Sequence, residues 1–486
     1  MSSSAQAALG QRQRSTLAWI VALGAAALTF DGYDLVVYGT VVSGLLRDPG
    51  QIGHLDPASA GALGSYALIG VMVGALASGA IGDFVGRRKV MLAALAWFSI
   101  GMAATALTTN VTMFGAFRFF TGIGVGSLVA TAGAIVAEFA PKNRRNFYNA
   151  IVYSGVPAGG VLASVLALAF DNGGNWRPLF LIGAAPLAVI LPLAVAKLPE
   201  SPLWLLARGR RPEAEELRRR AGDVLPEAAP DRARPAAGAA GGERAGFAGL
   251  ATRRFALPTA FLGLMSFAGL LLTYGLNTWL PEIMGQYGFG KAYSLTFLLV
   301  LNAAAIVGGL AAAATVDRTG PKRIITGTFA LAAVALVLLT FHMPFPVLLT
   351  AVGIAGIGTI GTQVLVYGFV SNFYTTQTRA AGVAWCAGFG RLGGILGPLA
   401  GGLLLSAGVT GQTAFYLFAV VALLGAVVTA LVPRPRGRAH DDVAAASRSG
   451  ATASTGVPSA GVPSTGGDSA PVEGTVPDGE PEPAVR

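Results

Sequence analysis

Charged side chains, cysteine and histidine are all scarce in this chain of 486 residues. Only 12% of the residues are charged, whereas a soluble globular domain carries about 25%. The single cysteine, Cys386, excludes an internal disulfide and a cysteine-cluster metal site. The three histidines, His54, His342 and His440, lie far apart and lack metal-ligand spacing. We therefore expect neither a metal nor a cofactor, and the scarcity of charge disfavours a soluble protein.

Apolar runs are abundant, since hydrophobic residues make up 53% of the chain and the mean hydropathy is +0.62. A run of about 20 apolar residues can cross a bilayer as a helix. Twelve such runs occur near 17–46, 58–82, 90–108, 112–137, 147–170, 177–197, 256–281, 293–316, 324–342, 345–370, 380–407 and 412–432. The first is no signal peptide, because it is too long, contains Asp31 and Asp34, and precedes eleven others. The sequence predicts an all-α integral membrane protein with twelve transmembrane helices.

The lysines and arginines indicate an orientation. With the N-terminus in the cytoplasm, cytoplasmic segments hold 29 of the 34 basic residues, and the outer loops hold three, Arg47, Arg177 and Lys291. This asymmetry follows the positive-inside rule. We expect both termini in the cytoplasm and a multi-pass protein of the inner (plasma) membrane. Topology then explains the net charge of +10, and nucleic-acid binding is not expected.

Polar segments divide the chain into five parts. They are a cytoplasmic N-terminal segment (1–16), an N-terminal six-helix half (17–197), a cytoplasmic central loop (198–255), a C-terminal six-helix half (256–432) and a cytoplasmic tail (433–486). In the central loop, 201–220 is a candidate surface helix, and 222–246, rich in Ala, Gly and Pro, is a predicted linker. The tail is rich in Ser, Gly, Pro and Glu, cannot bury a core, and is predicted to be disordered.

The two halves repeat one another at a constant offset of 234 residues. The offset pairs Asp83 with Asp317, Gly86 with Gly320, Arg88 with Lys322, Lys89 with Arg323, Arg145 with Arg379, and Gly159 with Gly393. Chance could match glycines in a chain with 67 of them, but it does not explain charged pairs between equivalent spans. Duplicated halves that flank a long loop are typical of transporters with a binding site at their interface.

Several motifs carry a family resemblance. The loop with Gly79, Asp83, Gly86, Arg87, Arg88 and Lys89 resembles the signature loop of the major facilitator superfamily. Further superfamily-like patterns are Arg118-x-x-x-Gly122-x-Gly124-x-Gly126, Glu138-Phe139-Ala140-Pro141 and Pro199-Glu200-Ser201-Pro202. More narrowly, the chain resembles the aromatic acid:proton symporter family in Asp31-Gly32-Tyr33-Asp34, Val37-Tyr38-Gly39-Thr40, Tyr274-Gly275-Leu276, Thr278-Trp279-Leu280-Pro281 and Gly390-Arg391-Leu392-Gly393. The resemblance covers residues 15–432 and implies the major facilitator fold.

Asp31 and Asp34 lie three residues apart on one face of the first span. An unpaired carboxylate within a membrane costs about 3 kcal/mol or more, so each should face a water-filled space or a partner. We interpret the pair as the proton-coupling site; the alternative is a structural pair bonded to neighbouring helices. Arg118 and Arg391 are the basic residues inside spans. We interpret Arg391 as the ligand of an anionic substrate and Arg118 as the charge partner of the aspartates; alternatively, both only lock helices together.

A second set of charged residues lies at the predicted cytoplasmic ends of the spans. Mirrored loops with aspartates beside basic residues suggest ion pairs that form in one conformation and break in another. The predicted gating residues are Asp83, Arg87, Arg88, Glu138, Arg145, Asp317, Arg318 and Arg379. The alternative for the arginines is that they only set the topology.

Aromatic side chains near the acidic pair suit a flat ring. We predict Tyr33, Tyr38, Tyr274, Trp279 and Phe389 as substrate-binding residues beside Arg391. Taken singly, each of them is more often a packing or lipid-facing residue, and the prediction rests on the set beside the acidic pair.

The predicted function is a proton-coupled secondary transporter that imports small aromatic carboxylates, of the benzoate or hydroxybenzoate type, by alternating access. Its expected partners are the aromatic acid, protons and the lipid bilayer, and it is expected to be a monomer. The alternatives are an exporter of drugs or metabolites, working as a proton antiporter, and a symporter of non-aromatic organic acids. An enzyme is not expected, because the spans contain no Ser-His-Asp, metal-ligand or phosphate-binding pattern.

Overall fold

The computed structural model describes residues 3–141, 145–170, 175–221, 246–252, 255–374 and 378–433. Residues Met1–Pro433 form one compact unit. The predicted linker at 222–246 lies almost entirely outside the described residues, and so does the predicted disordered tail, apart from Pro433. The parts of the chain that are described contain helices and no strands.

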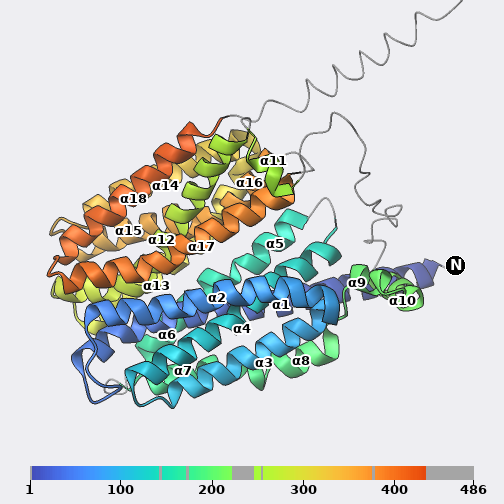
Figure 1. Cartoon of the computed structure of the whole chain (residues 1–486), viewed down its shortest axis with the longest axis horizontal. Helices are drawn as coiled ribbons and strands as arrows, with labels where there is room; N and C mark the ends of the chain where they lie inside the picture. The colour runs from blue at the N-terminus through green and yellow to red at the C-terminus, as the bar shows by residue number, and fades with distance from the viewer. Residues whose placement is uncertain are drawn as a thin grey trace, which may run out of the picture. The chain divides into compact units, whose positions relative to one another are not determined.

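The helices of the two halves form neighbouring groups, drawn from blue to green and from yellow-green to red in Figure 1. The N-terminal half contains α1 (Ser3–Arg47), α2 (Pro57–Val85), α3 (Arg87–Ala106), α4 (Val111–Phe139), α5 (Arg145–Tyr153), α6 (Gly155–Ala169), α7 (Arg177–Gly183), η1 (Ala185–Leu187) and α8 (Ile190–Lys197). The C-terminal half contains α12 (Ala256–Gln286), α13 (Lys291–Thr319), α14 (Pro321–Leu338), α15 (Phe345–Gly356), η2 (Ile357–Gly361), α16 (Thr362–Phe373), α17 (Arg379–Ser406) and α18 (Gly411–Leu431). Each half thus holds six membrane-length segments.

The twelve predicted spans are confirmed, because twelve helices are long and apolar enough to cross a membrane. Three spans consist of consecutive elements: α5 with α6, α7 with η1 and α8, and α15 with η2 and α16. Apart from the start of α1, the largest boundary differences are at α12, which continues through Pro281 to Gln286, and at α14, which ends at Leu338. At the start of the chain, α1 begins at Ser3, so the predicted N-terminal segment continues directly into the first span.

The described part of the central loop contains α9 (Pro202–Ala207), α10 (Arg211–Ala221) and α11 (Gly246–Leu250). The predicted surface helix at 201–220 is therefore two helices. The break falls at Gly209, whose φ of 73° is strained for any residue with a side chain. Ser201 caps α9, because its hydroxyl accepts a hydrogen bond from the Trp204 N–H at 3.1 Å.

Glycines let helices within a half approach through their backbones. Gly122 and Gly126 of α4 face Ala67 and Val71 of α2 so closely that a Cβ on either glycine would overlap a carbonyl oxygen. From α2, Gly70 makes the same kind of approach to the Phe119 carbonyl. This packing fixes α4, which carries Arg118, against α2. Lipid tails provide no hydrophobic drive for helix association, so close packing at small residues is the usual source of stability.

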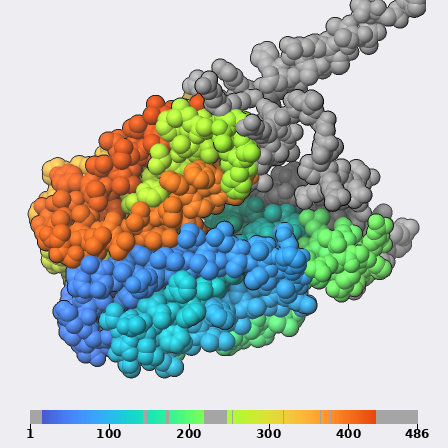
Figure 2. Space-filling model, in the orientation of Figure 1, coloured from blue at the N-terminus to red at the C-terminus, as the bar shows by residue number. Residues whose placement is uncertain are grey.

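The two halves contact each other mainly at one end of the bundle. We name this the Arg47 end, because α1 terminates there at Arg47. The opposite end, which contains the loop between α2 and α3, is named the Asp83 end. At the Arg47 end, the Arg47 guanidinium donates to the Glu282 carboxylate at 3.2 Å. Nearer the middle, the Ser65 hydroxyl donates to the Ile395 carbonyl at 2.6 Å. Figure 2 shows the surfaces of α2 (blue) and α17 (orange) in direct contact.

Backbone-to-backbone approaches reinforce this contact. A Cβ on Gly39 of α1 would overlap the Asn277 carbonyl of α12, and one on Gly402 of α17 would overlap the Pro57 carbonyl of α2. The hydrogen bonds between described residues of the two halves also belong to the Arg47 end or to the middle of the bundle. The bundle is therefore closed at the Arg47 end.

The α2–α4 approach gives the first testable prediction. Gly122→Ala places a methyl group on the Ala67 carbonyl, and overpacking of this kind typically costs about 1–3 kcal/mol. We expect a lower midpoint of thermal unfolding in detergent. The matched control is Gly79→Ala on α2, where a Cβ meets nothing within 4 Å. Equal midpoints for the two variants would show that the close approach contributes nothing to stability.

Candidate functional site

A buried ion pair joins α1 to α4 inside the N-terminal half. Asp34 is 0% exposed and Arg118 is 1% exposed. The Arg118 guanidinium donates to the Asp34 carboxylate and lies over the Tyr38 ring, 5.3 Å from its centroid. The Tyr38 hydroxyl in turn donates to the Ala60 carbonyl of α2 at 2.6 Å. Each charge is thus compensated within one half.

Asp31, one helical turn earlier on α1, has a different neighbour. It is 4% exposed and interacts electrostatically with Arg391 of the other half, and to a smaller degree with Asp34. It takes part in none of the ion pairs found among the described residues. The two span-one carboxylates are therefore not equivalent: Asp34 is paired within its own half, and Asp31 faces a cation across the interface.

Arg391 lies among tyrosines from both halves. Tyr274 of α12, Tyr367 of α16 and Tyr153 of α5 lie near the Arg391 guanidinium and interact with it electrostatically. Each of these four side chains is partly exposed although it lies in the middle of a span. These side chains come from opposite halves and interact with one another, so they lie at the interface between the halves. We name Asp31, Tyr153, Tyr274, Tyr367 and Arg391 the Arg391 group.

The face of α17 explains this position. Ile395, Pro398 and Gly402 follow Arg391 at helical spacing, and all three contact α2 of the other half. Arg391 therefore points toward the interface between the halves.

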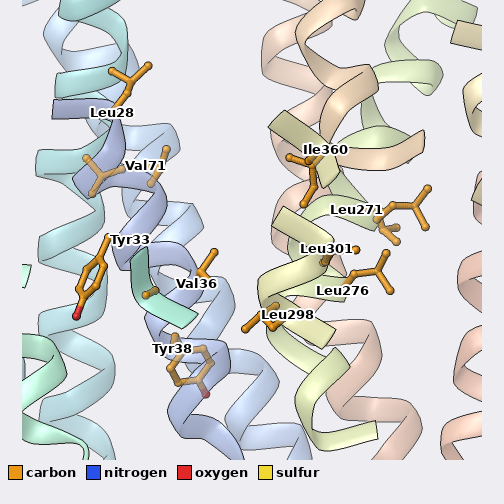
Figure 3. Close-up of a cluster of buried hydrophobic side chains, with 14 of the residues drawn as sticks. Leu28, Tyr33, Val36, Tyr38, Val71, Leu271, Leu276, Leu298, Leu301 and Ile360 are labelled. Carbon is orange, nitrogen blue, oxygen red and sulfur yellow. The ribbon is translucent and has the colours of Figure 1, made fainter. Parts of the chain in front are cut away.

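Four of the predicted aromatic ligands lie elsewhere. The Tyr33 hydroxyl donates to the Leu179 carbonyl at 2.6 Å, and Tyr38 packs on Arg118. Trp279 is 0% exposed, and its indole N–H donates to the Pro398 carbonyl at 2.7 Å. Figure 3 shows Tyr33 and Tyr38 among the apolar side chains of the N-terminal half, apart from those of the C-terminal half.

Phe389 is the fourth of these aromatic residues. It stacks on Trp385 with 5.4 Å between the ring centroids, and it shares its face of α17 with the exposed Leu392 and Leu396. Of the predicted aromatic ligands, the structure therefore brings Tyr274 alone to Arg391.

Several predicted gating residues meet at the Asp83 end of the N-terminal half. The Arg87 guanidinium pairs with the Glu138 carboxylate at 2.7 Å, and the Ser201 hydroxyl donates to the same carboxylate. Glu200, which the sequence interpretation did not single out, accepts the Arg88 backbone N–H at 2.9 Å. Gly86 makes room for it: its φ is 105°, and a Cβ there would lie 2.6 Å from the Glu200 carboxylate.

The remaining gating candidates make fewer described contacts. The Asp83 side chain is exposed, and its backbone carbonyl accepts the Trp204 indole N–H at 3.2 Å. Arg379 begins α17 and is partly buried. The side chains of Arg145, Asp317 and Arg318 lie outside the described residues. Whether the mirrored loops exchange ion pairs stays a prediction.

Tyr153 and Tyr367 are not among the residues predicted from the sequence. Both are polar aromatic residues inside spans, which is a signal, but many tyrosines of membrane proteins lie at interfaces or in packing positions. Only the direction in which each helix faces distinguishes Tyr153 and Tyr367 from the other tyrosines of the spans. Among the described residues, no three His, Cys, Asp or Glu side chains gather as a metal site.

Comparison with known proteins gives consistent matches along the chain. A profile of the family described as "Sugar (and other) transporter" matches residues 18–446. The gentisate transporter of Corynebacterium glutamicum is 34% identical over 83% of this chain and 85% of its own length. The benzoate transport protein of Acinetobacter baylyi is 31% identical over 85% of this chain and 89% of its own length.

A solved structure shows the same fold. The partially occluded inward-open xylose transporter XylE from E. coli superimposes with a TM-score of 0.69 at 19% identity, over 87% of this chain and 99% of that one.

The Asp34–Arg118 pair gives the second prediction. Arg118→Gln leaves a buried carboxylate without its cation, and breaking a buried pair in this way typically costs about 3–5 kcal/mol. We expect a marked fall in the unfolding midpoint in detergent, partly restored when Asp34→Asn removes the stranded charge. The matched control is Arg210→Gln. Arg210 pairs with Glu213 of α10, and this exposed ion pair contributes little to stability. Similar midpoints for Arg118→Gln and Arg210→Gln would contradict a stabilising role.

Proposed function

Because the chain belongs to the sugar (and other) transporter family, within the major facilitator superfamily, we propose that this membrane transporter is a proton-coupled importer of small aromatic carboxylates. The observation that carries the proposal is the Arg391 group, in which one guanidinium lies among a carboxylate from the other half and three tyrosines.

Coupling follows from competition for one cation. When Asp31 is charged, it compensates Arg391 across the interface. When Asp31 binds a proton, Arg391 is left with a net positive charge that favours a substrate carboxylate. The guanidinium fork matches such a carboxylate through two parallel hydrogen bonds. Proton and substrate therefore bind cooperatively, and by linkage each raises the affinity of the other.

Asp34 has a supporting role in this scheme. Its charge is already compensated by Arg118, so its protonation would leave a buried cation unpaired. We therefore assign the transported proton to Asp31, with Asp34 and Arg118 holding α1 in place beside it.

The aromatic character of the substrate is supported by two lines of argument. The relatives described above are named as transporters of gentisate and of benzoate. The Arg391 group supplies phenol rings next to the cation, and aromatic pairs in offset or edge-to-face contact gain about 0.5–1.5 kcal/mol beyond area burial. A small planar acid with its carboxylate on Arg391 would have these rings as neighbours.

Alternating access is supported by the contacts between the halves. We propose that the Asp83 end faces the cytoplasm, because that orientation places 29 of 34 basic residues inside. The structure then corresponds to a state closed toward the outside, and the Arg47–Glu282 pair belongs to the outer gate. The predicted gating residues around Asp83 and Asp317 would pair when the inner end closes.

The inward proton gradient supplies the driving force in this scheme. One proton that enters with one carboxylate anion carries no net charge, so the pH difference does the work. A difference of one pH unit is worth about 1.4 kcal/mol and supports about tenfold accumulation.

The third prediction tests the proton site. In Asp31→Asn the side chain binds no proton, so uptake of labelled benzoate into proteoliposomes should no longer respond to a pH gradient. Exchange of benzoate between equal solutions needs no net proton movement and should be largely retained. The matched control is Asp48→Asn, a carboxylate in the exposed loop that bonds only to Gln51 and Gly50. If Asp31→Asn still accumulates benzoate against a gradient, then Asp31 does not carry the proton.

The fourth prediction tests the substrate ligand. Arg391→Lys keeps the charge but loses the fork, and loss of a buried charge-assisted contact costs about 2–5 kcal/mol. The dissociation constant for benzoate should rise by tens- to thousands-fold in calorimetry on detergent-purified protein. Arg210→Lys, at an exposed position on the central loop, is the control. Unchanged benzoate affinity in Arg391→Lys, or tighter binding of aliphatic acids by the unmodified protein, would contradict the proposed site.

A further inference from the structure

A second polar group lies next to Tyr367, and its members lack partners. The side chain of Gln363 stands four residues before Tyr367 on α16, so the two share a helix face about 6 Å apart along the axis. Both the oxygen and the nitrogen of the Gln363 amide are buried without a hydrogen-bond partner. A Cβ on Gly269 of α12 would overlap the amide oxygen, so this glycine leaves the space beside it free.

Ser266 of α12 adds a third polar atom to the same region. Its side chain is 0% exposed, and its hydroxyl also lacks a hydrogen-bond partner. Gly390 of α17 lies against this hydroxyl, since a Cβ there would overlap it. Tyr367 is a polar neighbour of both Ser266 and Gln363, and the Cys386 thiol is a second neighbour of Ser266. One phenol hydroxyl cannot satisfy all the hydrogen-bond donors and acceptors of the Ser266 hydroxyl and the Gln363 amide, because the amide alone offers two donors and two acceptor sites.

Unpartnered buried groups of this kind are costly, and native proteins keep few of them. A ligand that satisfied all three would recover that cost. The amide needs a group that both donates and accepts, as a hydroxyl does, whereas an ionised carboxylate only accepts. The π-helix η2 directly precedes α16, and such irregular turns are frequent at functional sites.

We propose that Ser266, Gln363 and Tyr367 form a hydroxyl-binding pole of the substrate site, opposite Arg391, so that the chain prefers aromatic acids with a ring hydroxyl to benzoate. This inference rests on the proposed function, in which Arg391 binds the carboxylate. Tyr367 interacts with both Arg391 and Gln363, so it connects the two groups.

The test compares acids that differ only in ring hydroxyls. Full-length protein in proteoliposomes takes up labelled benzoate in competition with 3-hydroxybenzoate, 4-hydroxybenzoate and 2,5-dihydroxybenzoate. For the unmodified protein, the best hydroxylated acid should have a half-saturation concentration at least about tenfold below that of benzoate, because benzoate leaves the pole unpaired. In Gln363→Met, which keeps the size but removes the amide, the hydroxylated acids should lose their advantage and this ratio should fall to about one.

Further variants keep the test decisive if Gln363→Met fails to fold. Ser266→Ala removes the second partner, and Gly269→Ala displaces the Gln363 amide from the other side. Both should lower the preference for the hydroxylated acids. Gly368→Ala is the matched control on α16, since a Cβ there meets nothing within 4 Å, and it should keep the preference.

Two results would overturn the hydroxyl-binding pole. One is an unmodified protein that handles benzoate as well as every hydroxylated acid; the other is a preference that survives both Gln363→Met and Ser266→Ala. Failure of the proposed function looks different: no aromatic acid would be taken up or bound, whatever its substituents.

Discussion

A charge inside the membrane-spanning bundle has no bulk water around it, so its position depends on an opposite charge nearby. α1 carries two such charges on one face, and each has a different cation: Arg118 of α4 for Asp34, and Arg391 of α17 for Asp31. The first interaction lies within the N-terminal half and holds it together. The second crosses the interface between the halves. α1 is therefore the element through which the stability of one half and the chemistry of the interface are connected.

The two cations also differ in their surroundings. Arg118 is enclosed: Tyr38 covers it, and Asp34 uses its charge. Arg391 is partly exposed among tyrosines and has no close ion pair among the described residues. A guanidinium that is fully compensated serves structure, whereas one with only a distant compensating charge can accept a ligand. The same residue type thus has two roles, one in each half, and burial and partners determine which.

The fold could be predicted from the sequence because bilayer thickness and hydropathy fix the length and number of the spans. The site could be predicted only in part, because hydropathy does not say which way a helix faces. Asp31, Asp34, Arg118 and Arg391 stood out because charge is rare in spans, and the structure gives each a charged neighbour.

Aromatic residues carry no such signal. Trp279 and Phe389 belong to packing and to an exposed face, while Tyr153 and Tyr367 lie beside Arg391. Glu200 lies in a motif, but the sequence does not show that its carboxylate packs against Gly86. The structure shows this contact: Gly86 has a positive φ, and the Glu200 carboxylate occupies the position where a Cβ would lie. The break between α9 and α10 likewise depends on one left-handed residue, Gly209.

The glycines at the Arg47 end have a consequence for the kinetics of the molecule. Where Gly39 meets the Asn277 carbonyl and Gly402 meets the Pro57 carbonyl, the surfaces in contact are backbone without side chains. A glycine has no rotamers to order when the surfaces meet and none to release when they part. Separation at these points therefore changes side-chain conformational entropy very little. In the proposed alternating access the halves part at this end, and the cost then lies mainly in lost dispersion contacts and in the Arg47–Glu282 pair, with little contribution from side-chain entropy.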